Sequence, residues 1–302
     1  MAFDIPALAP RPPRGWNSFD CFGSAVTERE VLENAAILAR DFLPLGFDTV
    51  VVDYCWSHPD PGPCVNPDQA SGHLPRLAID EEHRLVPAPE RYPSAAGGRG
   101  FAPLAARVHA LGLKFGLHLM RGFPRQVLAE GTRTRRGGLA PADIADPSDT
   151  CAWLNHMCGV RADHSAGQAY YDSVFQLYAG WGVDFVKADD LTCPYREREI
   201  EMIDRARRAC GRDIILSLSP GACPPERADH VARHAEMWRL SPDFWDRWED
   251  LRRAFDLCAA WAERRRPGCW PDPDMLPLGR LSRRGPSGPE RDSRFNPAEA
   301  RS

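Results

Sequence analysis

The sequence lacks long hydrophobic runs, an excess of positive charge and paired cysteine motifs. No apolar run reaches the ~18 residues that a membrane-spanning helix needs. Residues 1–14 contain four prolines and no continuous apolar stretch, so no signal peptide is expected. The net charge of −4 lacks the excess of base that a nucleic-acid or anionic membrane surface requires. We therefore expect a cytoplasmic protein with no membrane or nucleic-acid partner.

Lysine is also scarce, and the cysteines are scattered. Only Lys114 and Lys187 interrupt an otherwise all-arginine set of 38 basic residues, so each lysine stands out. The ten cysteines form no C-x-x-C pair, which favours reduced thiols over a disulfide framework or a zinc site. The chain does contain 43% hydrophobic and 26% charged residues among its 302, which is typical of a globular protein with a sizeable core.

Short apolar runs alternate along the chain with helical patterns. A capping box at residues 27–30 opens a helix that reaches Phe42. A second capping box, from Ser165 to Gln168, opens a helix that ends at residues 180–182, and a longer helix is expected over residues 243–261. Strands that read as continuous apolar runs between helices indicate a parallel sheet covered on both faces. Strands are expected at residues 15–17, 49–52, 114–118, 183–188, 214–218, 237–238 and just before Pro271.

These seven strand candidates predict an α/β fold, a (β/α)8 TIM-type barrel that is incomplete at seven strands. We expect the barrel domain over residues 1–277 and an exposed, disordered tail over residues 278–302. Polar residues follow the strand candidates at their C-terminal ends, where TIM barrels build their active sites. These residues are Asp53, His118, Asp189, Ser219, Arg239, Asp272 and Asp274.

Two carboxylates, Asp189 and Asp243, suit acid and base chemistry. Strand alternation points Lys187 and Asp189 to the same side, so the ammonium group would keep Asp189 ionised as a nucleophile or stabiliser. A structural ion pair is the alternative. Asp243 precedes Phe244 and Trp245, an apolar setting that suits a carboxyl group that holds a proton, although taken alone it fits the N-cap of the next helix better. One ionised and one protonated carboxyl group is the pair that glycosidic-bond cleavage uses.

Six motifs occur in order over about residues 10–280: RGWNSF at 14–19, DYCW at 53–56, KFGLH at 114–118, KAD at 187–189, WR at 238–239 with Asp243, and WPDPDML at 270–276. Together they resemble glycoside hydrolase family 27, the α-galactosidases and α-N-acetylgalactosaminidases known as melibiases. The resemblance implies retaining exo-hydrolysis of terminal α-galactose-like residues through a covalent glycosyl-enzyme, with Asp189 as nucleophile and Asp243 as general acid/base. It also implies a carbohydrate substrate that is bound by Trp16, Asp53, Lys187, Arg239 and Asp274.

Three substrate-facing positions depart from the family pattern. Tyr54 stands where many members carry a second aspartate that contacts the sugar's 6-hydroxyl, and His118 stands where many carry tyrosine. Ser219 lies in the strand-5 loop, where galactose-preferring members often have a bulky acid. The family disulfide beside the nucleophile also looks absent, since Leu191 follows Asp189 by two residues. We predict that Ser219 and Tyr54 confer tolerance of a 2-N-acetyl group, of a pentopyranose that lacks C6, or of both.

Two other functions compete with the glycosidase. Family members continue into an eighth strand and usually a β-sandwich domain, so a truncated, inactive barrel that binds sugar weakly or not at all is one alternative. We also expect open barrel edges through which the chain self-associates. A metal-dependent hydrolase has only His230 and His234 in support, four residues apart on a helical stretch. No glutamate follows His230 as in H-E-x-x-H, so we expect a solvated helix face and no metal or other cofactor.

Overall fold

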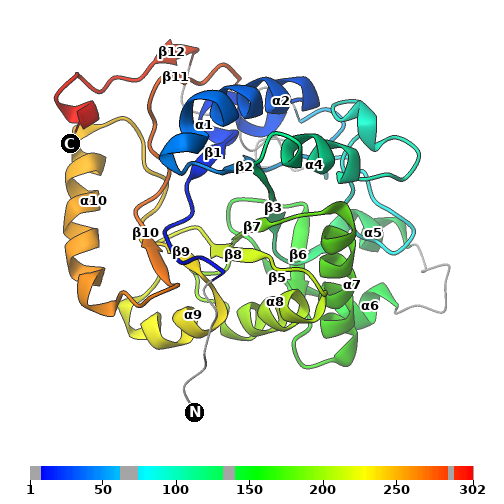
Figure 1. Cartoon of the computed structure of the whole chain (residues 1–302). Coiled ribbons are helices and arrows are strands. Elements are labelled where there is room, and N and C mark those ends of the chain that lie inside the picture. The colour runs from blue at the N-terminus through cyan, green and yellow to red at the C-terminus, as the bar shows by residue number, and fades with distance from the viewer. Residues whose placement is uncertain (1–7, 62–73, 132–139, 285–288, 302) are drawn as a thin grey trace.

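The computed structural model describes residues 8–61, 74–131, 140–284 and 289–301. Its centre is a curled sheet of seven parallel strands in the order β1-β2-β3-β7-β8-β9-β10 (Figure 1). The strands are β1 (Gly15–Asn17), β2 (Thr49–Val52), β3 (Lys114–Met120), β7 (Phe185–Asp189), β8 (Ile215–Leu218), β9 (Met237–Arg239) and β10 (Trp270–Asp272). All seven predicted strands are present, and most differ from prediction by one or two residues at an end. The predicted barrel architecture, incomplete at seven strands, is therefore confirmed for the part of the chain described.

Helices surround the outer face of this sheet. They are α1 (Phe19–Phe22), α2 (Glu28–Ile37), α4 (Ala102–His109), α5 (Arg125–Glu130), α6 (Pro141–Ile144), α7 (Ser165–Trp181), α8 (Glu197–Ala209), α9 (Ala228–His234) and α10 (Trp248–Trp261). A small antiparallel sheet of β4 (Phe123–Pro124), β6 (Met157–Val160) and β5 (Ala145–Thr150) lies beyond the end of β3. Across the described residues, no helix is both long enough and apolar enough to span a bilayer.

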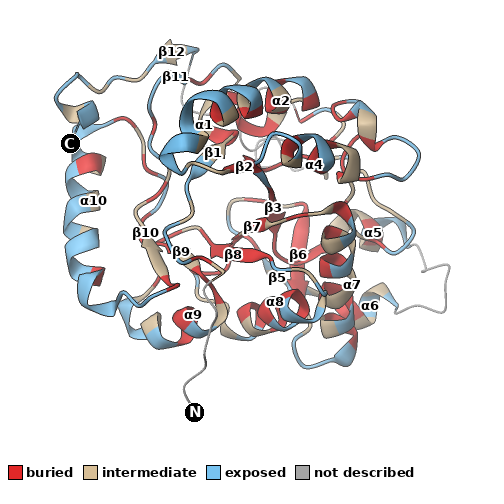
Figure 2. Cartoon of the chain, viewed as in Figure 1, coloured by how far each residue is buried: buried red, intermediate tan, exposed pale blue. Residues whose placement is uncertain are grey.

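Period-two alternation divides the strand side chains between two cores. Those that point outward pack with the helices into the main hydrophobic cluster, for example Val50, Val186 and Leu216. A second, smaller cluster lies on the inner face, where Val51, Phe185 and Ile215 pack with the N-terminal segment. Figure 2 shows buried strands at the centre and a largely exposed α10. The inward positions toward the C-terminal ends are left for polar side chains.

Helix boundaries follow the predictions with three differences. The capping box that opens α2 is present, with Glu30 accepting from the Thr27 N–H. The α-helical part ends at Ile37, and residues 38–42 form a π-helical turn that reaches Phe42. The N-cap of α7 is His164, one residue before the predicted Ser165, because His164 Nδ1 accepts from the Ala166 N–H. The predicted start of α10 at residue 243 is wrong by five residues.

Part of the segment 278–302, which was expected to be an exposed, disordered tail, is ordered and packed against the barrel. Strands β11 (Arg280–Leu281) and β12 (Arg291–Asp292) pair in antiparallel fashion, and Leu281 is only 2% exposed. Arg284 forms an ion pair with the buried Glu30 of α2, and Arg291 forms one with the buried Asp246. These buried ion pairs hold the segment against the barrel, and composition alone did not reveal them because each partner lies far away in sequence.

Candidate active site

Asp189 ends the central strand β7 and is held by hydrogen bonds from two neighbouring side chains. Its Oδ1 accepts from the Ser219 hydroxyl at 2.7 Å, and its Oδ2 lies 3.0 Å from His118 Nε2. Burial alone would raise the pKa of Asp189, but the hydrogen bond from His118 and the charge of Lys187 hold that pKa well below its ordinary value. Asp189 is therefore a buried, fixed and ionised carboxylate.

Lys187 joins this centre to the end of β2. Its Nζ donates to Asp53 Oδ2 at 2.9 Å, and the Asn17 side-chain amide donates to the same oxygen at 2.6 Å. The same ammonium lies 5.6 Å from the centre of the Phe19 ring. Burial would raise the pKa of Asp53, whereas the nearby charges of Lys187 and His118 lower it below its usual value. The Lys187 ammonium group thus lies near two carboxylates, Asp53 and Asp189. The alternation along β7 predicted only its proximity to Asp189.

Arg239 organises the opposite side of the site. It forms an ion pair with Asp274 at 2.6 Å and donates to Asp243 Oδ1 at 3.1 Å. The Phe244 backbone N–H also donates to Asp274, which ties the loop after β9 to the loop after β10. The N-cap interpretation of Asp243 is wrong, because α10 begins at Trp248 and Arg247 occupies the N-cap position. The Asp243 side chain is 53% exposed, so it is the member of the pair that faces solvent.

Asp20 of α1 belongs to the same cluster, and the sequence reasoning missed it. Burial raises the pKa of Asp20 to about 7, opposed by the charge of Lys187 and reinforced by Asp53 and Asp243. Arg239 also acts on it. The signal was available, because Asp20 directly follows the RGWNSF motif. It is a carboxyl group that titrates near neutrality among the charged groups of the site.

Of the remaining predicted residues, Tyr54 packs beside His118 and Trp16 points away from the cluster. Tyr54 is buried with its ring centroid 5.7 Å from that of His118 and 6.0 Å from those of His58 and His156. Trp16 does not join the cluster, since it points to the opposite face of β1 from Asn17 and packs edge-on against Phe22.

Two other residues contact the cluster, and only one of them was predicted. Phe19, whose ring centre lies 5.6 Å from Lys187 Nζ, was not predicted. Ser219 is 1% exposed and its hydroxyl is engaged with Asp189.

Comparisons with known proteins show which family the chain belongs to. The structure resembles that of a family 27 β-L-arabinopyranosidase from Geobacillus stearothermophilus in complex with arabinose, with 45% identity and a TM-score of 0.92. That match covers 97% of this chain and 68% of the other. The chain belongs to glycoside hydrolase family 27. A solved α-N-acetylgalactosaminidase-like protein from Bacillus halodurans, itself of assigned rather than demonstrated activity, is 44% identical over 94% of this chain and 66% of its own, with a TM-score of 0.79.

The other matches are less similar to the chain or cover less of it. A melibiase family model, described as alpha galactosidase A, matches residues 155–285. The α-galactosidase of Oryza sativa subsp. japonica is 28% identical over 276 residues, which are 90% of this chain. The chain spans about half the length of the curated relatives that it matches, 52% in the rice enzyme.

Proposed function

We propose that this chain carries the catalytic centre of a retaining exo-glycosidase, with Asp189 as nucleophile and Asp243 as general acid/base. The observation that carries the proposal is the contrast between the two carboxylates. Asp189 is buried and held ionised by His118 and Ser219, whereas Asp243 is half-exposed at the mouth of the same cluster. A nucleophile must be ionised and fixed, and an acid/base must reach both the leaving group and water.

The proposed reaction has two steps. An Asp189 oxygen attacks the anomeric carbon as protonated Asp243 gives its proton to the leaving glycosidic oxygen, which forms a covalent glycosyl-enzyme. Asp243 then removes a proton from water, and the resulting hydroxide attacks the anomeric carbon and releases Asp189. Arg239 keeps its ion pair with Asp274 while Asp243 changes its protonation state. Lys187, Asp53 and Asp274 supply the charged hydrogen-bonding groups for sugar hydroxyls.

The sugar that we favour is a terminal β-L-arabinopyranose. This pentose has the ring configuration of α-D-galactopyranose and lacks only the C6 hydroxymethyl group. Tyr54 places an aromatic ring where the family resemblance implies a carboxylate partner for the 6-hydroxyl. The Geobacillus relative, which is 45% identical, is a β-L-arabinopyranosidase. An α-galactosidase is the second candidate, supported by the melibiase model and the plant relatives.

Paired substrates test the choice of sugar. The ratio of kcat/KM for p-nitrophenyl β-L-arabinopyranoside over the α-D-galactopyranoside should exceed about tenfold, or about 1.4 kcal/mol. Tyr54→Asp should narrow that ratio by restoring a partner for the 6-hydroxyl. A preference for the galactoside in the wild-type protein would reject the arabinopyranose assignment and favour the second candidate. Failure to turn over either glycoside would favour the inactive-barrel alternative.

Two variants test the roles of the carboxylates. Asp189→Asn should abolish turnover of every substrate. Asp243→Asn should slow an alkyl glycoside far more than the p-nitrophenyl glycoside, whose leaving group needs no proton. Asp213→Asn is the matched control, because Asp213 is exposed and precedes β8 at the opposite end of the sheet. Equal losses for the two kinds of leaving group in Asp243→Asn would refute the acid role.

A further inference from the structure

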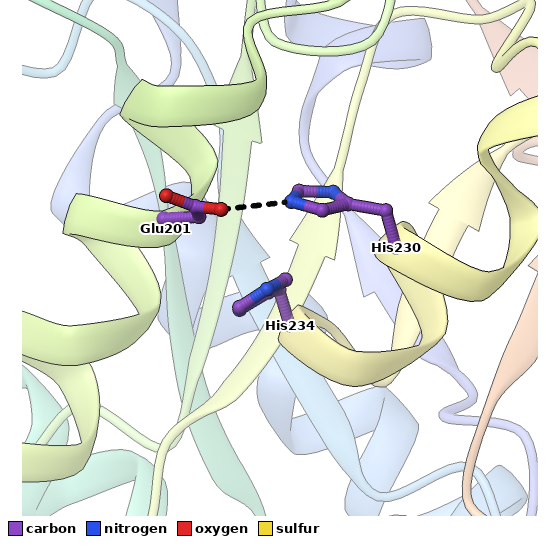
Figure 3. A group of neighbouring side chains, drawn as sticks. All are labelled: Glu201, His230 and His234. Atoms are coloured by element: carbon purple, nitrogen blue, oxygen red, sulfur yellow. Dashed lines mark hydrogen bonds and ion pairs between the residues drawn. The ribbon is translucent and has the colours of Figure 1, made fainter.

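Helices α8 and α9 bring three potential metal ligands together on the outside of the barrel. Glu201 of α8 faces His230 and His234 of α9, and the three side chains converge in the space between the helices (Figure 3). One ligand atom from each residue lies within 4.8 Å of the others. In the described chain, this is the one such group of histidine, cysteine and carboxylate side chains. It lies apart from the carboxylates at the C-terminal ends of the strands.

The spacing of the ligand atoms fits a tetrahedral ion. Zinc–nitrogen and zinc–oxygen bonds of about 2.0–2.2 Å place neighbouring ligand atoms about 3.3–3.6 Å apart. His230 Nε2 lies 3.4 Å from Glu201 Oε1. The Glu201 side chain is 40% exposed and has His230 as its hydrogen-bond partner within the described residues, so it can close the remaining gap toward His234 by rotation. The set therefore needs only a small rearrangement to bind a metal ion.

Each histidine is oriented through its other ring nitrogen, as ligating histidines usually are. The Tyr195 hydroxyl lies 2.6 Å from His230 Nδ1, which leaves Nε2 directed at Glu201. Asp204 Oδ2 lies 2.9 Å from His234 Nδ1, which leaves the Nε2 of His234 for a metal. A hydroxyl and a carboxylate thus hold the two imidazoles in orientations that a solvated helix face would not require.

The charges around the group are already paired. Arg227 is bound to Glu197, which itself lies 3.8 Å from His230 Nε2. Arg207 and Arg208 are bound to Asp204. These three arginines are therefore paired with carboxylates other than Glu201.

We propose that Glu201, His230 and His234 form a binding site for Zn²⁺ or a similar divalent transition-metal ion, which links α8 to α9. Two imidazoles and a carboxylate suit such ions, and water completes the coordination. The absence of an H-E-x-x-H motif concerns only metallopeptidase-type catalysis, in which that glutamate acts as the base. Here the carboxylate ligand comes from a different helix, which sequence spacing could not show. The role of the site is structural: a bound ion would stabilise α8 and α9, the helices that follow β7 and β8.

Metal titration of the full chain tests this proposal. Isothermal titration with ZnCl₂ should show one tight site per chain, and Co²⁺ should give the visible absorption of a tetrahedral complex. Free Zn²⁺ at about 100 times its Kd should raise Tm by about 3–5 °C, and a chelator should reverse the rise. His234→Gln and Glu201→Gln should each abolish the tight site and the Tm rise. Tyr195→Phe should weaken binding about 10–100-fold while leaving the stoichiometry unchanged.

His109→Gln is the matched control, since His109 pairs with Asp184 at 2.7 Å on another part of the barrel. This variant should bind Zn²⁺ as the wild type does. All the variants keep every cysteine, so any binding by thiols is common to them and is subtracted. Retention of full affinity by both His234→Gln and Glu201→Gln would overturn the proposal, as would the absence of saturable binding by the wild type. Loss of binding in His109→Gln would do the same.

Discussion

The ion pair between Lys187 and Asp53 offers a quantitative test of how the site is held together. Asp53 is 1% exposed, and its Oδ2 lies 2.9 Å from Lys187 Nζ. At an effective dielectric constant of about 20, two unit charges at that separation attract by about 6 kcal/mol, much of which offsets the cost of removing both from water. Replacing Lys187 with methionine leaves a buried carboxylate that keeps only neutral donors such as Asn17.

We expect Lys187→Met to lower the free energy of unfolding by about 3–5 kcal/mol at pH 7. Asp53→Asn should also destabilise, because the buried ammonium loses its direct partner. The double variant should lose less than the sum of the two, with a coupling of about 2–3 kcal/mol. Urea denaturation of the four proteins measures this cycle, provided that their m-values agree.

The pH dependence of the cycle gives an independent check. The pKa of Asp53 is lowered in the folded protein, so its pairing stabilises the fold above the ordinary carboxyl pKa. That stabilisation is lost as pH falls through the folded-state pKa, and the penalty of Lys187→Met should shrink in the same direction. The exposed pair Arg29–Glu33 on α2 is the control and should show no measurable coupling. Additive losses from the two single variants at pH 7 would refute the reasoning.

Three further changes have defined outcomes. Asp20→Asn should stabilise the protein by about 1–3 kcal/mol at pH 8.5 and not at pH 4, because burial raises the pKa of Asp20 to about 7 and penalises its ionised form. Urea denaturation at both pH values measures this change, and an equal gain in stability at both would contradict the prediction. Gly122→Ala would place Cβ 2.1 Å from the main-chain carbonyl oxygen of Cys158 at a φ of +99°, so it should lower Tm strongly. Gly131→Ala, whose Cβ would meet no described atom within 4 Å, should lower Tm much less. Ser219→Ala removes a hydrogen bond to Asp189 and should lower kcat about 10–100-fold, and an unchanged kcat would argue against an orienting role.

The strands and the direction of their side chains could be predicted because both follow from local patterns. Continuous apolar runs mark strands that are buried on both faces, and the period of two then fixes which residues share a face. Lys187 and Asp189 are two residues apart on β7, and both reach the inner cluster as predicted. The capping box at Thr27 is likewise local, since all of its donors and acceptors lie within four residues.

Features that depend on partners distant in sequence could not be predicted in this way. Asp243 looked like a helix cap because the residues around it allow one, but Arg239 donates to it instead and α10 begins five residues later. Trp16 was expected to bind the sugar by motif position, although the alternation along β1 directs it away from Asn17 and toward Phe22. Composition could not show that the chain after residue 277 packs against α2.

The positions that depart from the family pattern have different physical consequences. His118 and Ser219 both contact Asp189, so they act first on the orientation and ionisation of that carboxylate. A hydroxyl that is 1% exposed and already bonded to Asp189 is a poor source of space beside the sugar's 2-position. The Tyr54 ring packs among His58, His118 and His156. In the proposed function, selection between a hexose and a pentose depends on Tyr54, so Tyr54→Asp should change the substrate ratio and Ser219→Ala should change the rate.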